Sequence, residues 1–215
     1  QEKLSNYSGK MKPGTYLLST AYTPNRIMGI LAGDALLNYA YEVMTSAVCA
    51  ASPENMKNCA GAAAVIARKA GIFGMVGGQS LDVLLTDKPV NEKEMEFIFN
   101  LKTGALIEAA FMAGAILAGA GKECVSQLEK AGNLVGVAFQ IKDDILDVTS
   151  TQEVLGKPVF SDEKNNKTTY VTLYGMEKAA ADVENMSEKA ESIVKSIGDN
   201  EFLIELINKL ISREK

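Results

Sequence analysis

The sequence predicts an all-α fold, with residues 1–215 forming one helical bundle. Three observations favour it: apolar residues recur at three- and four-residue steps or fill whole segments, no βαβ alternation is visible, and helix-capping residues stand where several segments begin. Hydrophobic residues make up 47% of the 215 residues and charged residues 23%, which is typical of a compact chain that buries a sizeable core.

The first predicted helices lie in the N-terminal half. Residues 29–51 are apolar on most sides and contain no proline. Ser52 then suits an N-cap and Pro53 the first helical position of a second helix, which ends near Gly71. Residues 71–90 contain Gly, Pro, Asp and Lys and are predicted to connect this helix to the next.

The remaining helices follow residue 90. Asn91 and Glu94 form a capping-box pattern that starts a helix leading into 101–120, and 126–148 is a further buried helix. The connection 149–175 is long enough to suggest a function of its own. Two amphipathic helices then close the sequence, the second capped by Asn200. Their apolar positions are Ala179, Val183, Met186, Ala190, Ile193 and Ile197, then Leu203, Leu206, Ile207 and Leu210.

Charge and residue types exclude several classes of function. The net charge is −5 without a Lys/Arg-rich run, so we expect no nucleic-acid partner. The chain has no histidine, which removes His general bases, Ser-His-Asp triads and His-ligated zinc. Cys49, Cys59 and Cys124 have no metal-ligand spacing and suggest reduced thiols, and no secretory leader is recognisable, so we expect a cytoplasmic protein.

The most apolar stretch, 104–121, approaches the length that spans a bilayer. It carries Glu108 and is dominated by Ala and Gly. We therefore expect a close-packed helix inside a core, with no stable membrane insertion.

The residues most suited to chemistry are the three aspartates of FQIKDDILD (139–147). On a helix, Asp143, Asp144 and Asp147 fall within one arc of about 100°, among apolar neighbours. Carboxylates this close repel one another unless a cation is present, and their oxygens suit Mg²⁺. The pattern is short, and by itself it fits a solvated acidic patch at a helix end equally well.

Lysines accompany the aspartates. Lys102 and Thr103 open the predicted helix 101–120, where a helix N-terminus would attract an anion. Lys157 and Lys167 follow in the connection 149–175. Three separate places thus offer a cation to a magnesium-bridged diphosphate, although a lone lysine is usually only solvated.

The segment 74–82 (GMVGGQSLD) is rich in glycine but matches no phosphate-binding loop motif. Its glycines would allow close helix packing or a kink. If the segment is helical, Gln79 and Asp82 share one face.

Six motifs lie along the chain in a fixed order. They are LAGDALL (31–37), GMVGGQSLD (74–82), LKTGALI (101–107), VAFQIKDDILD (137–147), LGKP (155–158) and SDEKNNKTTYV (161–171). In this order, and from about residue 27 to the C-terminus, the sequence resembles the trans-isoprenyl diphosphate synthases, of the bacterial farnesyl and geranylgeranyl diphosphate synthase type. The resemblance implies an orthogonal helical bundle around a central substrate cavity.

The resemblance also implies an Mg²⁺-dependent prenyltransferase. Such an enzyme condenses isopentenyl diphosphate with dimethylallyl or geranyl diphosphate and yields farnesyl or geranylgeranyl diphosphate and pyrophosphate. Members are usually homodimers. The matching positions imply magnesium ligands at Asp143, Asp144 and Asp147, allylic-diphosphate contacts at Lys102, Thr103, Gln140, Lys157 and Lys167, and catalytic roles for Lys102 and Asp143.

Residues 1–30 depart from the family pattern. Family members carry a first Asp-rich motif with a following Arg pair ahead of the LAGDALL helix, and residues 1–30 contain no Asp. The segment 8–13 (SGKMKP) resembles the family's GGKRxRP element, which implies that Lys10 and Lys12 contact isopentenyl diphosphate. Either segments are missing from this sequence, which we expect, or the protein lacks half of its metal site.

Two other functions fit parts of the pattern. A non-catalytic prenyl-synthase-like subunit would bind substrate or a partner without the first Asp-rich motif. A terpene cyclase also ionises diphosphates on Asp-rich motifs, but it is not expected to carry GMVGGQSLD and KTG in this order. Product length in this family is set just upstream of the first Asp-rich motif, so the sequence leaves it open.

Overall fold

The computed structural model describes residues 26–149, 168–198 and 200–213, and every element within these ranges is a helix. The all-α prediction is therefore confirmed. Contacts along the chain divide it into two compact units, residues 1–56 and 57–215. The expectation of one domain stays a prediction.

The first unit contains α3 (Arg26–Ala50), whose bounds come close to the predicted 29–51. It is an unbroken helix of 25 residues without proline. Its exposed large apolar side chains are Ile30, Leu31, Leu36, Leu37, Tyr39, Tyr41 and Val43. A helix with apolar side chains on most sides is typical of one that is covered by another surface.

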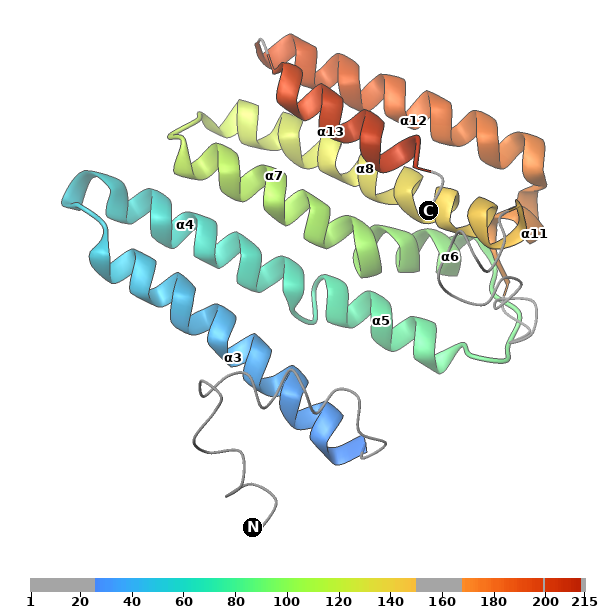
Figure 1. The fold of residues 1–215 in the computed structure, drawn as a ribbon, viewed down its shortest axis with the longest axis horizontal. Helices are drawn as coiled ribbons and strands as arrows, with labels where there is room; N and C mark the ends of the chain where they lie inside the picture. Colours follow the sequence, from blue (N-terminus) through green and yellow to red (C-terminus); the bar gives the residue numbers. More distant parts are fainter. Residues whose placement is uncertain (1–25, 150–167, 199, 214–215) are drawn as a thin grey trace, which may run out of the picture. The chain divides into compact units, whose positions relative to one another are not determined.

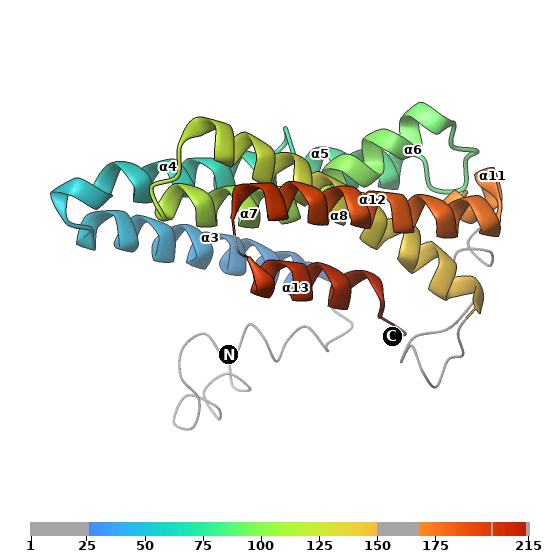
Figure 2. The same ribbon diagram turned by 90° about the horizontal axis from the view of Figure 1, so that it is seen from above.

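The central helix of the second unit is α8 (Lys122–Thr149), as Figures 1 and 2 show. It packs along α7 (Ala105–Leu117) and α12 (Met176–Ile197), and it also contacts α13 (Glu201–Ile211) and the short α11 (Tyr170–Tyr174). Its fully buried apolar side chains are Ala131, Val135, Ala138 and Ile141. Helical spacing of these four positions places them on the core side of α8.

The other helices of the second unit lead up to α7. They are α4 (Pro53–Ala70), whose first turn lies in the first unit, then α5 (Met75–Leu84), α6 (Glu92–Ile98) and the π-helix η1 (Phe99–Gly104). The backbone stays in the right-handed helical region from α6 through η1 into α7, so these three form one continuous helix. A π-helix inserted in a longer helix often marks a functional position.

The capping predictions have different outcomes. The capping box is confirmed, because the Glu94 N–H donates to Asn91 Oδ1 at 3.0 Å and the Asn91 N–H donates to Glu94 Oε2 at 2.9 Å. The cap predicted at Asn200 is wrong, since its side chain makes no cap bond to α13. The turn at Gly198 (φ 155°) brings carbonyls within reach instead, and Asn200 Nδ2 donates to Val194 O and Gly198 O.

The prediction that 71–90 and 149–175 only connect helices is wrong in part, because α5 and α11 lie within them. The glycines of α5 lower its helix propensity, but Gly78 is buried against the backbone of Lys102. Tertiary packing here outweighs local propensity.

Two helical stretches, Pro53–Leu84 and Glu92–Leu117, are long and apolar enough to cross a membrane by length and composition alone. The test is weak, since core helices also pass it, and 39% of the second window is buried. Within that window α7 buries Ala105, Ala109 and Ala113. The absence of membrane insertion stays a prediction.

A polar network explains why the apolar stretch 104–121 carries Glu108. Lys69 Nζ of α4 donates to Glu108 and, at 2.7 Å, to Glu129 Oε1, while Asn133 Nδ2 donates to Glu108 Oε1 at 2.7 Å and Asn100 Oδ1 at 3.0 Å. Burial alone would lower the pKa of Lys69, but the hydrogen bonds to Glu108 and Glu129 outweigh it and raise that pKa. The buried carboxylate is thus paired on both oxygens.

Candidate functional site

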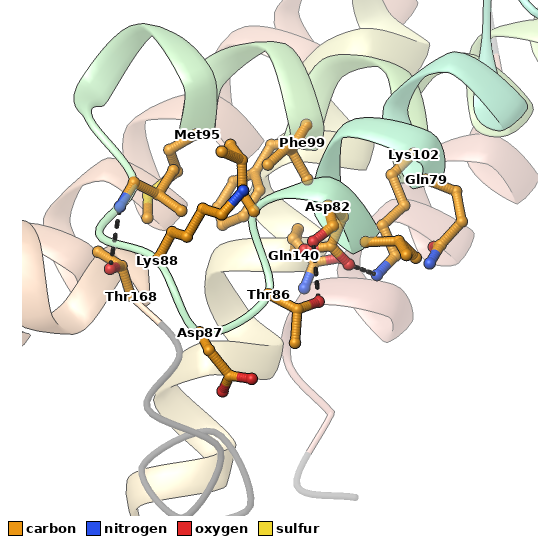
Figure 3. A pocket seen from close by; sticks show the side chains of 14 residues that line it. Gln79, Asp82, Thr86, Asp87, Lys88, Met95, Phe99, Lys102, Gln140 and Thr168 are labelled. Atoms are coloured by element: carbon orange, nitrogen blue, oxygen red, sulfur yellow. Dashed lines mark hydrogen bonds and ion pairs between the residues drawn. The ribbon is translucent and has the colours of Figure 1, made fainter.

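A cavity of about 510 Å³ lies among α5, α6, η1, α8 and the loop after α5 (Figure 3). Its polar lining comes from Gln79, Asp82, Thr86, Asp87, Lys88, Lys102, Gln140 and Thr168. Its apolar lining comes from Val83, Leu85, Val90, Met95, Ile98 and Phe99. A cavity with converging polar groups beside an apolar wall suits a ligand that has one charged end and one hydrocarbon end.

Lys102 carries the positive charge that meets α5. Its Nζ donates to Asp82 Oδ2 at 2.5 Å, and the two side chains are 30% and 14% exposed. Figure 3 shows this pair at the cavity, beside Gln79. Gln79 and Asp82 both line the cavity from α5, as expected for positions three apart on a helix.

The expectation that Lys102 and Thr103 open a helix is wrong. Both lie in η1, inside the continuous α6–η1–α7 helix, so their backbone does not form a free helix N-terminus. Thr103 Oγ1 instead donates to Gln140 Oε1 of α8 at 2.9 Å. These residues therefore face their neighbours through side chains, and η1 links α5 to α8.

Glycines let three backbones come close at this point. A Cβ at Gly78 would collide with the backbone N of Lys102, and one at Gly136 would lie 2.5 Å from the Cα of Gly104. Gly78 belongs to α5 and Gly136 to α8, so η1 is held between them at backbone contact. The glycines of GMVGGQSLD thus set the position of Lys102 rather than cradle a phosphate.

The predicted metal ligands lie on α8 in different surroundings. Asp143 accepts a hydrogen bond from Arg213 Nη2 at 2.6 Å, and the two side chains are 30% and 20% exposed. Asp144 is 5% exposed and accepts a hydrogen bond from the Tyr170 N–H at 2.7 Å, at the first residue of α11. Asp147, one helical turn beyond Asp143, is 4% exposed.

The start of α11 fastens this end of α8 to α12 and to the cavity. The Tyr170 hydroxyl donates to Asp182 Oδ2 of α12 at 2.7 Å, and the Val90 N–H donates to Thr168 Oγ1 at 3.3 Å. Hydrogen bonds from Lys178 and then from Tyr170 lower the pKa of Asp182. Burial and the bond to Asp182 raise the pKa of Tyr170, so its hydroxyl stays a donor.

A comparison with protein-family models places this site in a known group. The polyprenyl synthetase family model matches residues 19–207, a range that contains every element lining the cavity. The chain belongs to the polyprenyl synthetase family.

Curated polyprenyl synthetases share more than a third of the aligned residues. The farnesyl diphosphate synthase of Geobacillus stearothermophilus is 38% identical over 161 residues, 73% of this chain and 54% of that protein. The geranylgeranyl diphosphate synthase of Cyanophora paradoxa is 38% identical over 165 residues, 76% of this chain and 54% of that protein. The chain therefore spans about half the length of these relatives.

Solved structures of polyprenyl synthetases agree with the fold. The geranyltransferase of Helicobacter pylori, complexed with magnesium and isoprenyl diphosphate, has a TM-score of 0.74 and 27% identity, covering 89% of this chain and 62% of its own. The geranylgeranyl pyrophosphate synthetase of Pyrococcus horikoshii has a TM-score of 0.73 and 28% identity, covering 87% of this chain and 67% of its own.

The carboxylates of α8 fit a magnesium ion of the kind seen with the Helicobacter protein. Within the described ranges, no three or more His, Cys, Asp or Glu side chains converge as a complete metal cage. Mg²⁺, however, is commonly held by one or two carboxylates, with water and substrate phosphates completing the shell. The donor set fits that open type of site, and the magnesium role of Asp143, Asp144 and Asp147 stays a prediction.

Sequence reasoning reached some of these residues and not others. Lys10, Lys12, Lys157 and Lys167 lie outside the described residues. Lys102, Thr103 and Gln140 are brought together by η1 and α8. The partners Arg213 and Tyr170 were missed, because nothing in the local pattern of either residue links it to an aspartate 70 or 26 positions away.

Proposed function

We propose that the full natural chain containing this sequence is a short-chain trans-prenyl diphosphate synthase. It would condense isopentenyl diphosphate with dimethylallyl or geranyl diphosphate to give farnesyl or geranylgeranyl diphosphate and pyrophosphate. One observation carries the proposal: Lys102, Gln140 and an apolar wall share one cavity, next to the aspartates of α8. The names of the relatives support the same chemistry.

In the proposed reaction, the allylic C1–O bond breaks and its electron pair leaves with the diphosphate. The double bond of isopentenyl diphosphate then forms a new carbon–carbon bond to C1, and a proton is lost from the resulting cation. The protein contributes charge stabilisation and positioning rather than a nucleophile. This explains how a chain without histidine can carry out the reaction.

Lys102 is proposed to hold the allylic diphosphate. Asp82 keeps its ammonium group directed into the cavity, and phosphate oxygens would share or replace that carboxylate as acceptors. Thr103 and Gln140 supply neighbouring polar groups, while the apolar wall would hold the hydrocarbon chain and exclude water from the allylic cation.

We propose Asp143, Asp144 and Asp147 as the residues that hold Mg²⁺. When bound there, the ion neutralises charge on the leaving diphosphate. Lys157 and Lys167 are proposed as further allylic-diphosphate contacts, and Lys10 and Lys12 as contacts to isopentenyl diphosphate. These four assignments depend on the family motifs alone.

The proposed enzyme works in the cytoplasm as a homodimer. The exposed apolar side chains of α3 support a protein partner surface on that helix. Light scattering after size exclusion of the full natural chain should give twice the mass of one subunit. A mass of one subunit at micromolar concentration would contradict the dimer.

Product analysis separates the enzyme from a non-catalytic subunit. The full natural chain is incubated with Mg²⁺, labelled isopentenyl diphosphate and either dimethylallyl or geranyl diphosphate, and the products are separated by chain length. We expect label in a C15 or C20 diphosphate. No elongated product with either primer would overturn the enzyme and favour a subunit that only binds substrate or a partner.

A further inference from the structure

Arg213, which follows α13, reaches across to the aspartate motif of α8. Its Nη2 donates to Asp143 Oδ1 at 2.6 Å and to the carbonyl oxygen of Phe139 at 3.2 Å. The guanidinium carbon lies 3.6 Å from the centroid of the Phe139 ring. One basic side chain thus covers both the carboxylate and the preceding turn of α8.

The position of Arg213 is set by α13. This helix buries Ile207 and Ile211 and contacts both α8 and α12. Arg213 comes two residues after Ile211, where α13 has ended, so its side chain is delivered to α8 by a packed element and not by a free tail. Its contact with Asp143 therefore couples the aspartate to the end of α13.

The Arg213–Asp143 pair is incomplete as a structural ion pair. A single nitrogen makes both hydrogen bonds, whereas arginine and carboxylate commonly form two parallel bonds. Arg213 Nε is buried and finds no acceptor in the part of the chain that the structure describes. An unpaired buried N–H is costly, so this arrangement is less stable than a bidentate pair would be.

We propose that Arg213 is a built-in counter-cation, which occupies Asp143 until a divalent cation takes its place. Cation binding would displace the guanidinium group and release the end of α13 from α8. The inference rests on the proposed function, since it needs Asp143 to be a magnesium ligand. It adds that the metal site is coupled to a C-terminal helix whose sequence gives no sign of a metal role.

The coupling follows from competition for one carboxylate oxygen. Arg213 and a divalent cation cannot both contact Asp143 Oδ1 closely without strong repulsion between them. Each must therefore weaken the other by the same factor, which for such couplings is typically about 5- to 150-fold. We expect about tenfold, because the pair is partly exposed and monodentate.

Magnesium titration of the substrate-free protein tests the proposal. Isothermal calorimetry with MgCl₂ is carried out on the full natural chain and on its Arg213→Gln, Arg213→Lys and Lys209→Gln variants. Lys209 pairs with Glu205 on the exposed side of the same helix and serves as the matched control. We expect about tenfold tighter Mg²⁺ binding for Arg213→Gln, a smaller gain for Arg213→Lys and no change for Lys209→Gln.

Hydrogen exchange gives a second readout that needs no variant. Saturating Mg²⁺ should speed amide exchange in 207–213 of the wild-type chain, while exchange across α12 stays unchanged. Unchanged exchange in 207–213, or Mg²⁺ binding to Arg213→Gln no tighter than to wild type, would overturn the counter-cation. If the wild type still makes elongated product, only this inference fails; if it makes none, the proposed function fails.

Discussion

At the scale of single residues, the pair Lys102–Asp82 says most about the chemistry. An ammonium group needs a counter-charge when it is partly buried, and Asp82 provides it across the junction of η1 and α5. The same carboxylate competes with any phosphate for the ammonium. Lys102 is thus directed in advance while its charge remains available to an incoming diphosphate.

Replacing Lys102 tests this role. Lys102→Ala should lower kcat/KM for the allylic substrate by about 10- to 150-fold, the equivalent of one charge-assisted hydrogen bond of about 1.5–3 kcal/mol. The exposed Lys122 at the start of α8 is the control, and Lys122→Ala should leave kcat/KM unchanged. Steady-state kinetics at varied allylic diphosphate would refute the assignment if both variants behaved alike.

At the scale of helices, η1 is the element on which the site depends. It stands between α5 and α8 at backbone contact, through Gly78 and Gly136, and it carries Lys102 and Thr103 in neighbouring directions. An α-helical path through the same residues would rotate these side chains relative to the cavity.

The close approach can be tested with two alanine substitutions. Gly136→Ala would put a methyl group 2.5 Å from the Cα of Gly104, and we expect a loss of about 1–3 kcal/mol of unfolding free energy and a fall in kcat/KM as η1 moves. Gly114 of α7 has open space at the Cβ position, so Gly114→Ala should stabilise by up to about 1 kcal/mol. Urea unfolding compares the two, and equal stabilities would contradict the close packing.

The link between α11 and α12 predicts a pH dependence. Hydrogen bonds from Lys178 and Tyr170 lower the pKa of Asp182, so its contribution to stability is present above the ordinary pKa of about 4 and is lost as pH falls through the lower folded value. The stability difference between wild type and Asp182→Asn should therefore be largest near neutral pH and shrink below pH 4. A difference that stays constant down to pH 2 would exclude this linkage.

The sequence predicted the helices and much of the site, and the misses have physical reasons. Periodic apolar positions located α3, α4, α12 and α13, because amphipathic spacing reports burial directly. The π-helical geometry of η1 depends on contacts with α5 and α8, which local spacing does not encode. The cavity could be anticipated only through the family motifs. The Asp143–Arg213 contact could not, since it depends on where α13 packs.

At the scale of the whole molecule, the site described is one part of a longer family pattern. The cavity, η1 and the aspartates of α8 all belong to the second unit, residues 57–215. Relatives that match this chain are about twice as long as the matched region. The proposed activity therefore belongs to the full natural chain, with the α8 aspartates as one side of its metal site.

The most direct test of the central claim is turnover of the full natural chain with Asp143→Ala. Labelled isopentenyl diphosphate, an allylic diphosphate and Mg²⁺ are supplied, and elongated product is measured against wild type. We expect product formation to fall by at least about a thousandfold, because a ligand to the ion that neutralises the leaving diphosphate is lost. Turnover equal to wild type would contradict the assignment of α8 as the diphosphate-ionising element.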